Sequence, residues 1–454
     1  FDRLLPLLLS EIAKSDDPEN AVTRFQGVIE RTQSAIELFR LLTAEPELIE
    51  RLVKALTLSP RLAGTLARRP ETLDVLLERQ PIDFDNTYAH ALQQMREGPE
   101  RDDYEAKLDC IRQVTSEARF TLGISLLEAE HKPSRIAAAL SHVAEAALTA
   151  ALEAAQEEFA RAHGHIADSE LLVLGLGRLG GGALSPASDL DMIYLFRGDI
   201  GAESDGARPL GTTLYYNRLA TRVSAALSVP TAQGARYEGD TRLRPQGNQG
   251  PLAVSIEAFA KYQRESAWTW EHMALNRARV LTGHPKARAN VEEIIAATQR
   301  QSRDPAQLRT DVLKMRSEMV QHKHPKGELD VKLMRGGLID VEFLVHFLQL
   351  REAASKADGQ PLMLSPDFAE AIPALIELNL LERELWPSYD LLTDVLVAGR
   401  LLAPDTKEPP PAAASALARA CGRTSYSELL ADVAKARQCV ARCWAETFDE
   451  TLET

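Results

Sequence analysis

The sequence predicts a mainly helical protein that surrounds a small α+β core. Apolar residues make up 45% of the 454 positions and aromatic residues only 6%, a balance that favours helices over β-sandwiches. Apolar side chains recur at helical spacing through about the first 165 residues. Near Glu170 the pattern changes abruptly to short apolar runs separated by glycines, which is typical of strands and tight turns.

Charge, cysteine content and hydropathy exclude several classes of protein. The chain carries 52 Lys and Arg against 66 Asp and Glu, a net charge of −14, whereas a general nucleic-acid binder needs a basic face. Four cysteines are too few for a disulfide scaffold, so we expect a reducing, cytoplasmic setting. No apolar run reaches the ~18–20 residues of a membrane span. A first residue Phe1, without a basic leader after it, suggests a piece of a longer protein.

At ~150 residues per domain, the length suggests about three domains. We expect a helical N-terminal region over 1–165, a catalytic α+β domain over 166–300 and a helical bundle for regulation or partner binding over 301–454.

Prolines divide the first region into several helices, because a residue before proline disfavours helical backbone. They follow Ser59, Arg69 and Lys132. From Ser134 to His163 an apolar residue recurs every three or four positions, and Gly164 then supplies a common helix end.

The middle region alternates short strands with helices. Leu171–Leu174 and Asp189–Phe196 read as buried strands, with glycines at 175, 177, 180, 181 and 182 between them. A helix follows around Tyr216–Leu227, and a further extended segment runs from Ala235 to Arg244. This mixture is typical of a compact α/β or α+β domain.

Helices return towards the C-terminus. We expect a cap and first-turn proline at Ser365-Pro366, a proline-rich linker over Ala403–Ser415 and a final helix pair over about 415–453. The other predicted helices are Ala258–Arg279, Asp311–Gln321 and Asp340–Arg351.

Two carboxylates in the second strand point to a metal site. Residues two apart on a strand face the same way, so Asp189 and Asp191 project together and repel one another unless they are protonated or share a cation. Oxygen ligands of this kind suit Mg²⁺. The glycine pair Gly180-Gly181 lies just upstream, where a turn can bring backbone N–H groups close to a triphosphate.

A third acid lies in a matching frame. If residues 237–244 are extended, the charged positions 238, 240, 242 and 244 share one face. Asp240 can then complete a three-carboxylate, two-metal site. Arg242 and Arg244 either neutralise phosphate oxygens or form surface salt bridges.

The spacing Gly-Gly, seven residues, Asp-x-Asp and a later single Asp resembles the polymerase-beta type of nucleotidyltransferase. Four ordered stretches resemble the glutamine synthetase adenylyltransferase family more closely: GLGRLGG…SDLDMIYLF, YEGDTRLRPQGNQGPL, AWTWEHMALNRARVLTG (267–283) and DVKLMRGGLIDVEFLVHFLQL (330–350). Family proteins resemble a tandem of two catalytic halves, and this chain has one Gly-Gly…Asp-x-Asp. The motif Trp268-Thr269-Trp270-Glu271-His272 resembles the C-terminal, adenylylating half.

The resemblance implies a transfer of AMP from ATP to a tyrosine hydroxyl of glutamine synthetase, with PII signal protein and glutamine as regulators. It implies that Asp189, Asp191 and Asp240 hold two Mg²⁺ ions, with Asp240 also able to accept the tyrosine proton. Nucleotide contacts would come from Gly180, Gly181, Ser188, Arg242, Arg244 and Lys332. The loop departs from the family pattern at Ala183 and Ser185–Ala187, which predicts a less rigid loop.

Other functions stay open beside this one. The chain is alternatively the AMP-removing half, which uses phosphate as the attacking group, or a catalytically silent module that binds glutamine synthetase or PII. Uridylylation of PII is a further alternative, although no His-Asp pair typical of that family follows here.

Several conspicuous residues have simpler interpretations. Lys332, Asp330 and Glu342 either reach the site or form an ion-pair network between domains. Trp268 and Trp270 are interpreted as core residues rather than an adenine-stacking platform. The remaining expectations are a solvated loop for His322 and His324, structural thiols for Cys439 and Cys443, and a turn for Asp83 and Asp85.

Overall fold

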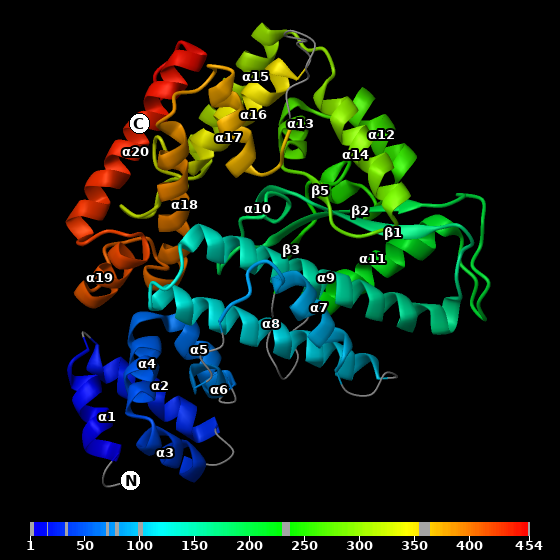
Figure 1. The fold of residues 1–454 in the computed structure, drawn as a ribbon. Coiled ribbons are helices and arrows are strands. Elements are labelled where there is room, and N and C mark those ends of the chain that lie inside the picture. Colours follow the sequence, from blue (N-terminus) through cyan, green and yellow to red (C-terminus); the bar gives the residue numbers. More distant parts are fainter. Residues whose placement is uncertain are drawn as a thin grey trace.

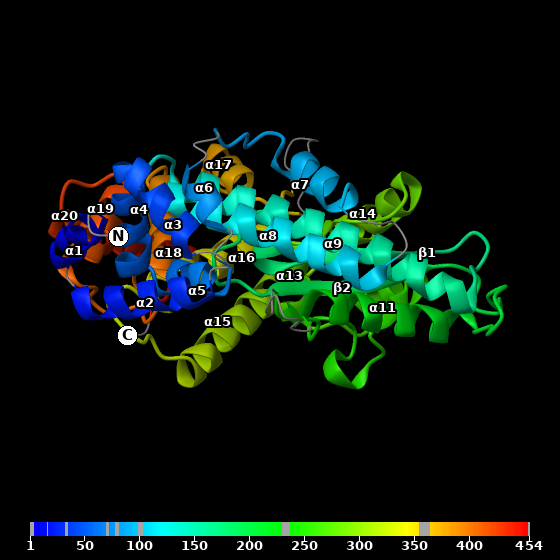
Figure 2. The same ribbon diagram turned by 90° about the horizontal axis from the view of Figure 1, so that it is seen from below.

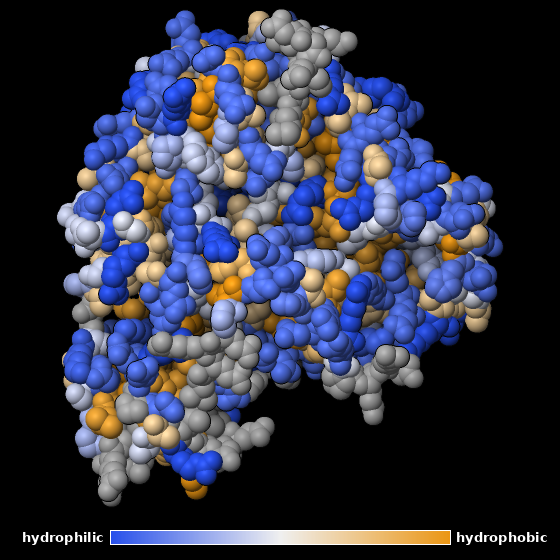
Figure 3. Space-filling model, in the orientation of Figure 1, coloured by the Kyte–Doolittle hydropathy of each residue, from blue (hydrophilic) through white to orange (hydrophobic). Residues whose placement is uncertain are grey.

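A computed structural model of the chain describes residues 4–15, 17–31, 35–69, 72–77, 81–98, 103–228, 237–353 and 364–452. Helices dominate it, and a small mixed sheet lies in the middle of the chain (Figure 1). The face shown in Figure 3 is mostly hydrophilic, with separate small apolar patches. The predicted fold class is therefore confirmed as mainly helical with a small sheet, whereas the three-part domain division stays a prediction.

Short helices form the N-terminal end of the molecule. They are α1 (Leu4–Ala13), α2 (Pro18–Arg31), α3 (Ala35–Ala44), α4 (Pro46–Leu58), α5 (Pro60–Arg68), α6 (Leu73–Leu77) and α7 (Thr87–Arg96). The Ser59 hydroxyl accepts a hydrogen bond from the Leu62 amide at the start of α5, as expected for a helix cap before a first-turn proline. The break predicted at Arg69-Pro70 falls partly outside the described residues, and α5 ends at Arg68.

Two long helices connect this end to the sheet. They are α8 (Tyr104–Leu127) and α9 (Pro133–His163), and Gly164 ends α9 with φ +67° as predicted. Helix α9 packs against α7, α8, α11 and α18, and by length and composition alone it could cross a membrane. Because 78% of its most apolar window is buried inside the molecule, α9 is the central core helix.

The sheet has five strands of mixed direction. They are β1 (Glu170–Gly175), β2 (Leu190–Arg197), β3 (Gly239–Asp240), β4 (Ala253–Ser255) and β5 (Arg279–Val280), in the order β3-β2-β1-β5 with β4 also paired to β2. Strand β1 is antiparallel to β2 and β5, whereas β3 and β4 run parallel to β2. The two predicted strands are confirmed, and the turn between them includes α10 (Gly177–Gly180).

Helices cover both faces of the sheet (Figures 1 and 2). One face of β2 carries Leu190, Met192, Tyr194 and Phe196 into the main core, against α9 and α11 (Thr212–Ser228). The other face carries Ile193 and Leu195 into a second core with α12 (Ile256–Glu265) and α14 (Pro285–Gln299). The alternation predicted for this strand is confirmed.

The predicted helix Ala258–Arg279 is wrong as a single element. Helix α12 ends at Glu265, where the amides of Ser266 and Ala267 both donate to the Tyr262 carbonyl. A new helix, α13 (Thr269–Leu275), then starts where the Glu271 carboxylate accepts the Trp268 amide over 2.9 Å. The chain continues into β5.

The remaining helices confirm most of the C-terminal predictions. They are α15 (Pro305–His322), α16 (Leu338–Glu352), α17 (Phe368–Glu377), α18 (Leu385–Leu402), α19 (Pro411–Ala420) and α20 (Tyr426–Phe448). The cap of α17 is Asp367 rather than Ser365, since the Asp367 side chain accepts the Ala369 amide. Helix α19 begins inside the predicted linker, so the non-helical part of that linker ends at Pro410.

Candidate active site

The pairing of β2 with β3 brings the three predicted acids together. In this parallel pair Asp191 lies opposite Asp240, and the Leu190 amide donates to the Glu238 carbonyl over 2.9 Å. Opposed residues on neighbouring strands project to the same face, and Asp189 precedes Asp191 by two residues. Asp189 is exposed, whereas Asp191 and Asp240 are half-buried. The three carboxylates therefore meet at one edge of the sheet.

The electrostatics of this edge show an excess of negative charge. Burial raises the pKa of Asp191 to about 6, and the nearby carboxylates of Asp240 and Asp189 add to the rise. Lys332 opposes it and lies close enough to act on Asp191. Partly buried carboxylates that repel one another are the donor set that a divalent cation compensates.

Asp240 is already paired with Arg242. The Arg242 Nε donates to both Asp240 oxygens, at 3.0 and 2.9 Å, and hydrogen bonds from this guanidinium lower the pKa of Asp240. The backbone amide of Arg242 also donates to Asp240 Oδ1 over 2.9 Å. This contact between residues two apart is typical of an Asx turn, which ends the strand at Asp240.

The prediction of one extended charged face over residues 237–244 is therefore wrong, and positions 235 and 236 lie outside the described residues. After the turn, Arg244 is 9% exposed and its Nη1 donates to the Thr241 carbonyl over 2.8 Å. Its Nε reaches the Gly250 carbonyl at 3.4 Å. Arg244 holds the turn together, and its role at a phosphate stays a prediction.

The glycine pair is tied to a buried arginine. The amides of Gly180 and Gly181 donate to the carbonyls of Leu176 and Gly177, so both hydrogen-bond within α10. A Cβ on Gly180 would lie 1.8 Å from the Arg277 carbonyl oxygen, and one on Gly181 would lie 1.9 Å from Arg277 Nη2. Close packing on Arg277 thus requires both glycines, while their predicted phosphate contact stays a prediction.

The loop that leads to Asp189 is held from several sides. Ser188 Oγ accepts the Ser185 amide over 2.9 Å and lies 2.9 Å from the Ser185 hydroxyl. Arg119 donates to the Pro186 carbonyl over 2.7 Å, and the Leu184 amide donates to the Ser141 hydroxyl over 3.0 Å. The substitutions that predict a less rigid loop are therefore offset by contacts from α8 and α9.

Lys332 and Glu342 face the carboxylates from the helical side. Glu342 lies 3.5 Å from Arg277 Nη1. Burial alone would raise the pKa of Glu342, but Arg277, Arg178 and Lys332 outweigh it and hold the pKa below its usual value. Burial lowers the pKa of Lys332. The charges of Lys332 and Glu342 both act on Asp191, and the choice between a site role and an ion-pair network between domains stays open.

Asp330 belongs to a separate turn, where its carboxylate accepts the amides of Lys326 and Leu333 at 3.1 and 3.3 Å.

Sequence reasoning missed Arg277, which is 3% exposed and stacks on the Phe368 ring at 4.4 Å. Arg277 lies within the family-like motif at 267–283. Its sequence context does not set it apart from the other charged residues of that motif, and its contact with the glycine pair appears only in the structure.

The prediction that the two neighbouring tryptophans are core residues is wrong. Trp268 is 69% exposed and Trp270 40%, because they stand at the start of α13 while Glu271 and Met273 face inward.

The other simple interpretations fit the structure. Cys439 and Cys443 are buried, and a contact with Arg442 occupies the Glu382 carboxylate beside them. His322 and His324 are exposed, although His322 ends a helix rather than lying in a loop. Asp83 accepts the Asn86 amide over 3.2 Å in a turn before α7. Asp85 lies in the same non-helical stretch.

Comparisons with known proteins agree on one family. A family model described as glutamate-ammonia ligase adenylyltransferase matches residues 49–294, which include all three carboxylates. A protein of Mesorhizobium japonicum is 40% identical over 378 residues, covering 81% of this chain and 38% of the relative. A protein of Xanthobacter autotrophicus is 35% identical over 473 aligned residues, covering 100% of this chain and 46% of the relative. Both are named bifunctional glutamine synthetase adenylyltransferase/adenylyl-removing enzyme, and the chain spans less than half of their length.

Proposed function

The chain belongs to the glutamate-ammonia ligase adenylyltransferase family, and we propose that it moves AMP from ATP onto a tyrosine hydroxyl of glutamine synthetase, releasing pyrophosphate. The observation that carries this proposal is the meeting of Asp189, Asp191 and Asp240 at one sheet edge. Under this proposal, the small mixed sheet and the helices around it form a nucleotidyltransferase domain of the polymerase-beta type. The target protein comes from the names of the relatives.

The carboxylates fit a divalent cation. Their oxygen donors suit Mg²⁺, and burial first, then the charges of Asp240 and Asp189, raise the pKa of Asp191 to about 6, a cost that a bound cation would offset. Asp189, Asp191 and Asp240 would hold the metal, which when bound neutralises phosphate charge and lowers the pKa of an attacking hydroxyl. Asp240 would accept the tyrosine proton only after Arg242, whose side chain is exposed, has moved away from its oxygens.

The cationic side of the site would receive the nucleotide phosphates. Lys332 is half-buried, and its positive charge lowers the pKa of Asp191, so this charge acts on the carboxylate edge. Glu342 pairs with Arg277, and Arg277 in turn packs against the glycine turn. From this position Lys332 would orient a phosphate oxygen.

The Trp268–His272 motif supports the adenylylating direction over the AMP-removing one. Two parallel assays separate them. One measures label transferred from [α-³²P]ATP to unmodified glutamine synthetase in Mg²⁺; the other measures ADP released from adenylylated glutamine synthetase with phosphate. We expect label transfer in the first, and its loss in the Asp189→Asn/Asp191→Asn double variant. ADP release alone would assign the opposite activity, and neither product from the folded protein would favour a silent binding module.

A further inference from the structure

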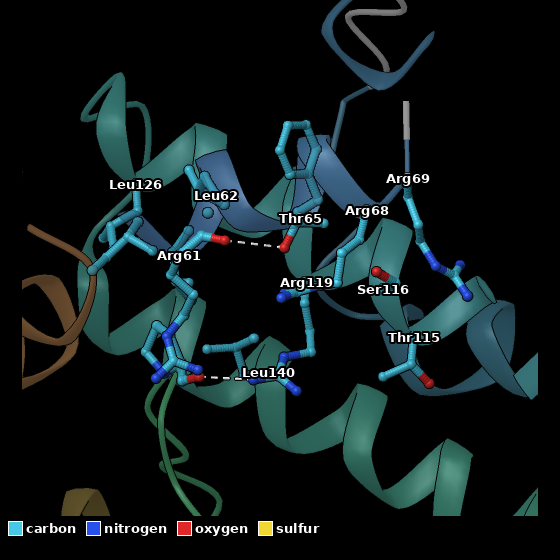
Figure 4. Close-up of a pocket in the computed structure, with 15 residues that line it drawn as sticks. Arg61, Leu62, Thr65, Arg68, Arg69, Thr115, Ser116, Arg119, Leu126 and Leu140 are labelled. Atoms are coloured by element: carbon cyan, nitrogen blue, oxygen red, sulfur yellow. Dashed lines mark hydrogen bonds between the residues drawn. The ribbon is translucent and has the colours of Figure 1, made fainter. Parts of the chain in front are cut away.

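A cavity of about 150 Å³ lies between α5, α8 and α9, with Pro186 of the loop before Asp189 also in its wall. Arginines dominate its polar lining. Arg61 and Arg68 lie in α5, Arg69 follows directly after α5, and Arg119 lies in α8. The hydroxyl-bearing residues Thr65, Thr115 and Ser116 also line it. Figure 4 shows the side chains of Arg61 and Arg119 extending toward the same hollow. None of the three carboxylates, nor Lys332, lines this cavity.

The described lining of this cavity gathers positive charge. Among the described residues, no Asp or Glu contributes to the wall. Partial burial lowers the pKa of Arg61, and the three charged groups that act on it, Arg119, Arg400 and Arg68, are all cations that lower it further. Guanidinium groups that share a partly buried cavity repel one another. An anion bound between them would be attracted to each of these groups.

We propose that this cavity binds a small oxyanion, a phosphate or a carboxylate, held by the guanidinium groups of Arg61, Arg68 and Arg119. Guanidinium forks match the planar or tetrahedral oxygens of such groups, and nearby hydroxyls supply further hydrogen bonds. The volume of about 150 Å³ is below the ~300–1,000 Å³ of sites for drug-sized ligands. The ligand is therefore a small ion rather than a whole nucleotide.

Arg119 connects this cavity to the carboxylate edge. It donates to the Pro186 carbonyl over 2.7 Å, three residues before Asp189. Its guanidinium also stacks on the ring of Tyr237 at 5.0 Å, three residues before Asp240. One side chain thus contacts both segments that carry the acids. An anion that draws Arg119 into the cavity would change these two contacts, which makes Arg119 a positioning residue for the site.

Titration calorimetry tests the binding step without metal or nucleotide. The chain in a chloride-containing Hepes buffer is titrated with inorganic phosphate and, separately, with succinate. We expect at least one of the two ions to bind, with an affinity that falls tenfold or more in Arg61→Gln and in Arg68→Gln. Both side chains are exposed, so neither substitution should disturb folding. Arg40→Gln, an exposed arginine on α3 outside the cavity, is the matched control and should bind as the wild type does.

Binding of phosphate alone, of succinate alone or of both would identify the oxyanion accepted. No heat with either ion, or equal affinity in the cavity variants and the control, would overturn the proposal. Because these titrations contain no Mg²⁺ and no ATP, a failure of AMP transfer would leave their result unchanged, and the two proposals fail separately.

Hydrogen exchange tests the connection through Arg119. Adding the bound ion should change amide exchange in peptides that cover 185–189 and 237–240, while a peptide from α20 stays constant. In Arg119→Lys, which keeps the charge and loses the fork, the change in both segments should shrink or vanish. Bound ion with unchanged exchange in these two segments of the wild type would refute the connection.

Discussion

Replacing Asp191 with Asn should stabilise the metal-free protein while destroying its proposed function. The carboxylate is half-buried, and burial together with the charges of Asp240 and Asp189 raises its pKa from 3.8 to about 6. At neutral pH the folded protein must keep this group ionised where it is disfavoured. A neutral side chain of the same shape removes that cost, as is often found at sites that trade stability for function.

The magnitude follows from the shift. A rise from 3.8 to about 6 corresponds to about 3 kcal/mol between the two protonation states. Since folding raises the pKa of Asp191, its favourable contribution is complete below pH 3.8 and is lost as the pH rises through about 6. The gain from Asp191→Asn is therefore largest above pH 7 and mostly gone at pH 4.5. For 454 residues unfolding as one unit, it raises the unfolding midpoint by on the order of 3 °C.

The assay is thermal unfolding in EDTA at pH 8 and pH 4.5, comparing Asp191→Asn with the wild type. Asp189→Asn is the matched control, because it removes an exposed carboxylate of the same cluster and should move the midpoint far less. An equal midpoint for Asp191→Asn and wild type at pH 8, or a gain that is as large at pH 4.5, would refute the electrostatic account.

Three further substitutions test individual contacts. Gly180→Ala should lower the free energy of unfolding by about 1–3 kcal/mol in urea denaturation, because its Cβ would meet the Arg277 carbonyl at 1.8 Å; an unchanged midpoint would contradict this packing. Arg242→Gln should tighten Mg²⁺ binding about twofold to fivefold in calorimetry, since Arg242 competes with the metal for both Asp240 oxygens. The control is Arg264→Gln, which changes an exposed arginine, and equal Mg²⁺ affinity in the two variants would argue against competition. Trp268→Ala should change stability by less than about 0.5 kcal/mol, because the indole is 69% exposed, and a larger loss would indicate a packed side chain.

The sequence was sufficient to predict the carboxylate edge because it depends on strand periodicity. Residues two apart share a face on any strand, so Asp189 and Asp191 could be paired without knowing the sheet. The short strand at Asp240 then pairs in register with Asp191. The end of α9 was predictable for a similar reason, since Gly164 supplies the positive φ that stops a helix.

Contacts between distant residues or between side chain and backbone were not predictable in the same way. The turn after Asp240 arises because its carboxylate captures the Arg242 amide, which competes with an extended backbone. The glycine pair is required by Arg277, almost 100 residues later, so its packing role has no local signal. The outward position of Trp268 follows from the cap that starts α13, which overrides the usual burial of an indole.

The central claim is that Asp189, Asp191 and Asp240 together bind the metal that serves AMP transfer. Anomalous diffraction from crystals of the chain soaked with Mn²⁺ and a non-hydrolysable ATP analogue tests it most directly. The account predicts anomalous peaks within about 2.1–2.2 Å of these carboxylates, beside the analogue's phosphates. Nucleotide bound without a metal at this edge, or metal bound only elsewhere in the protein, would contradict it.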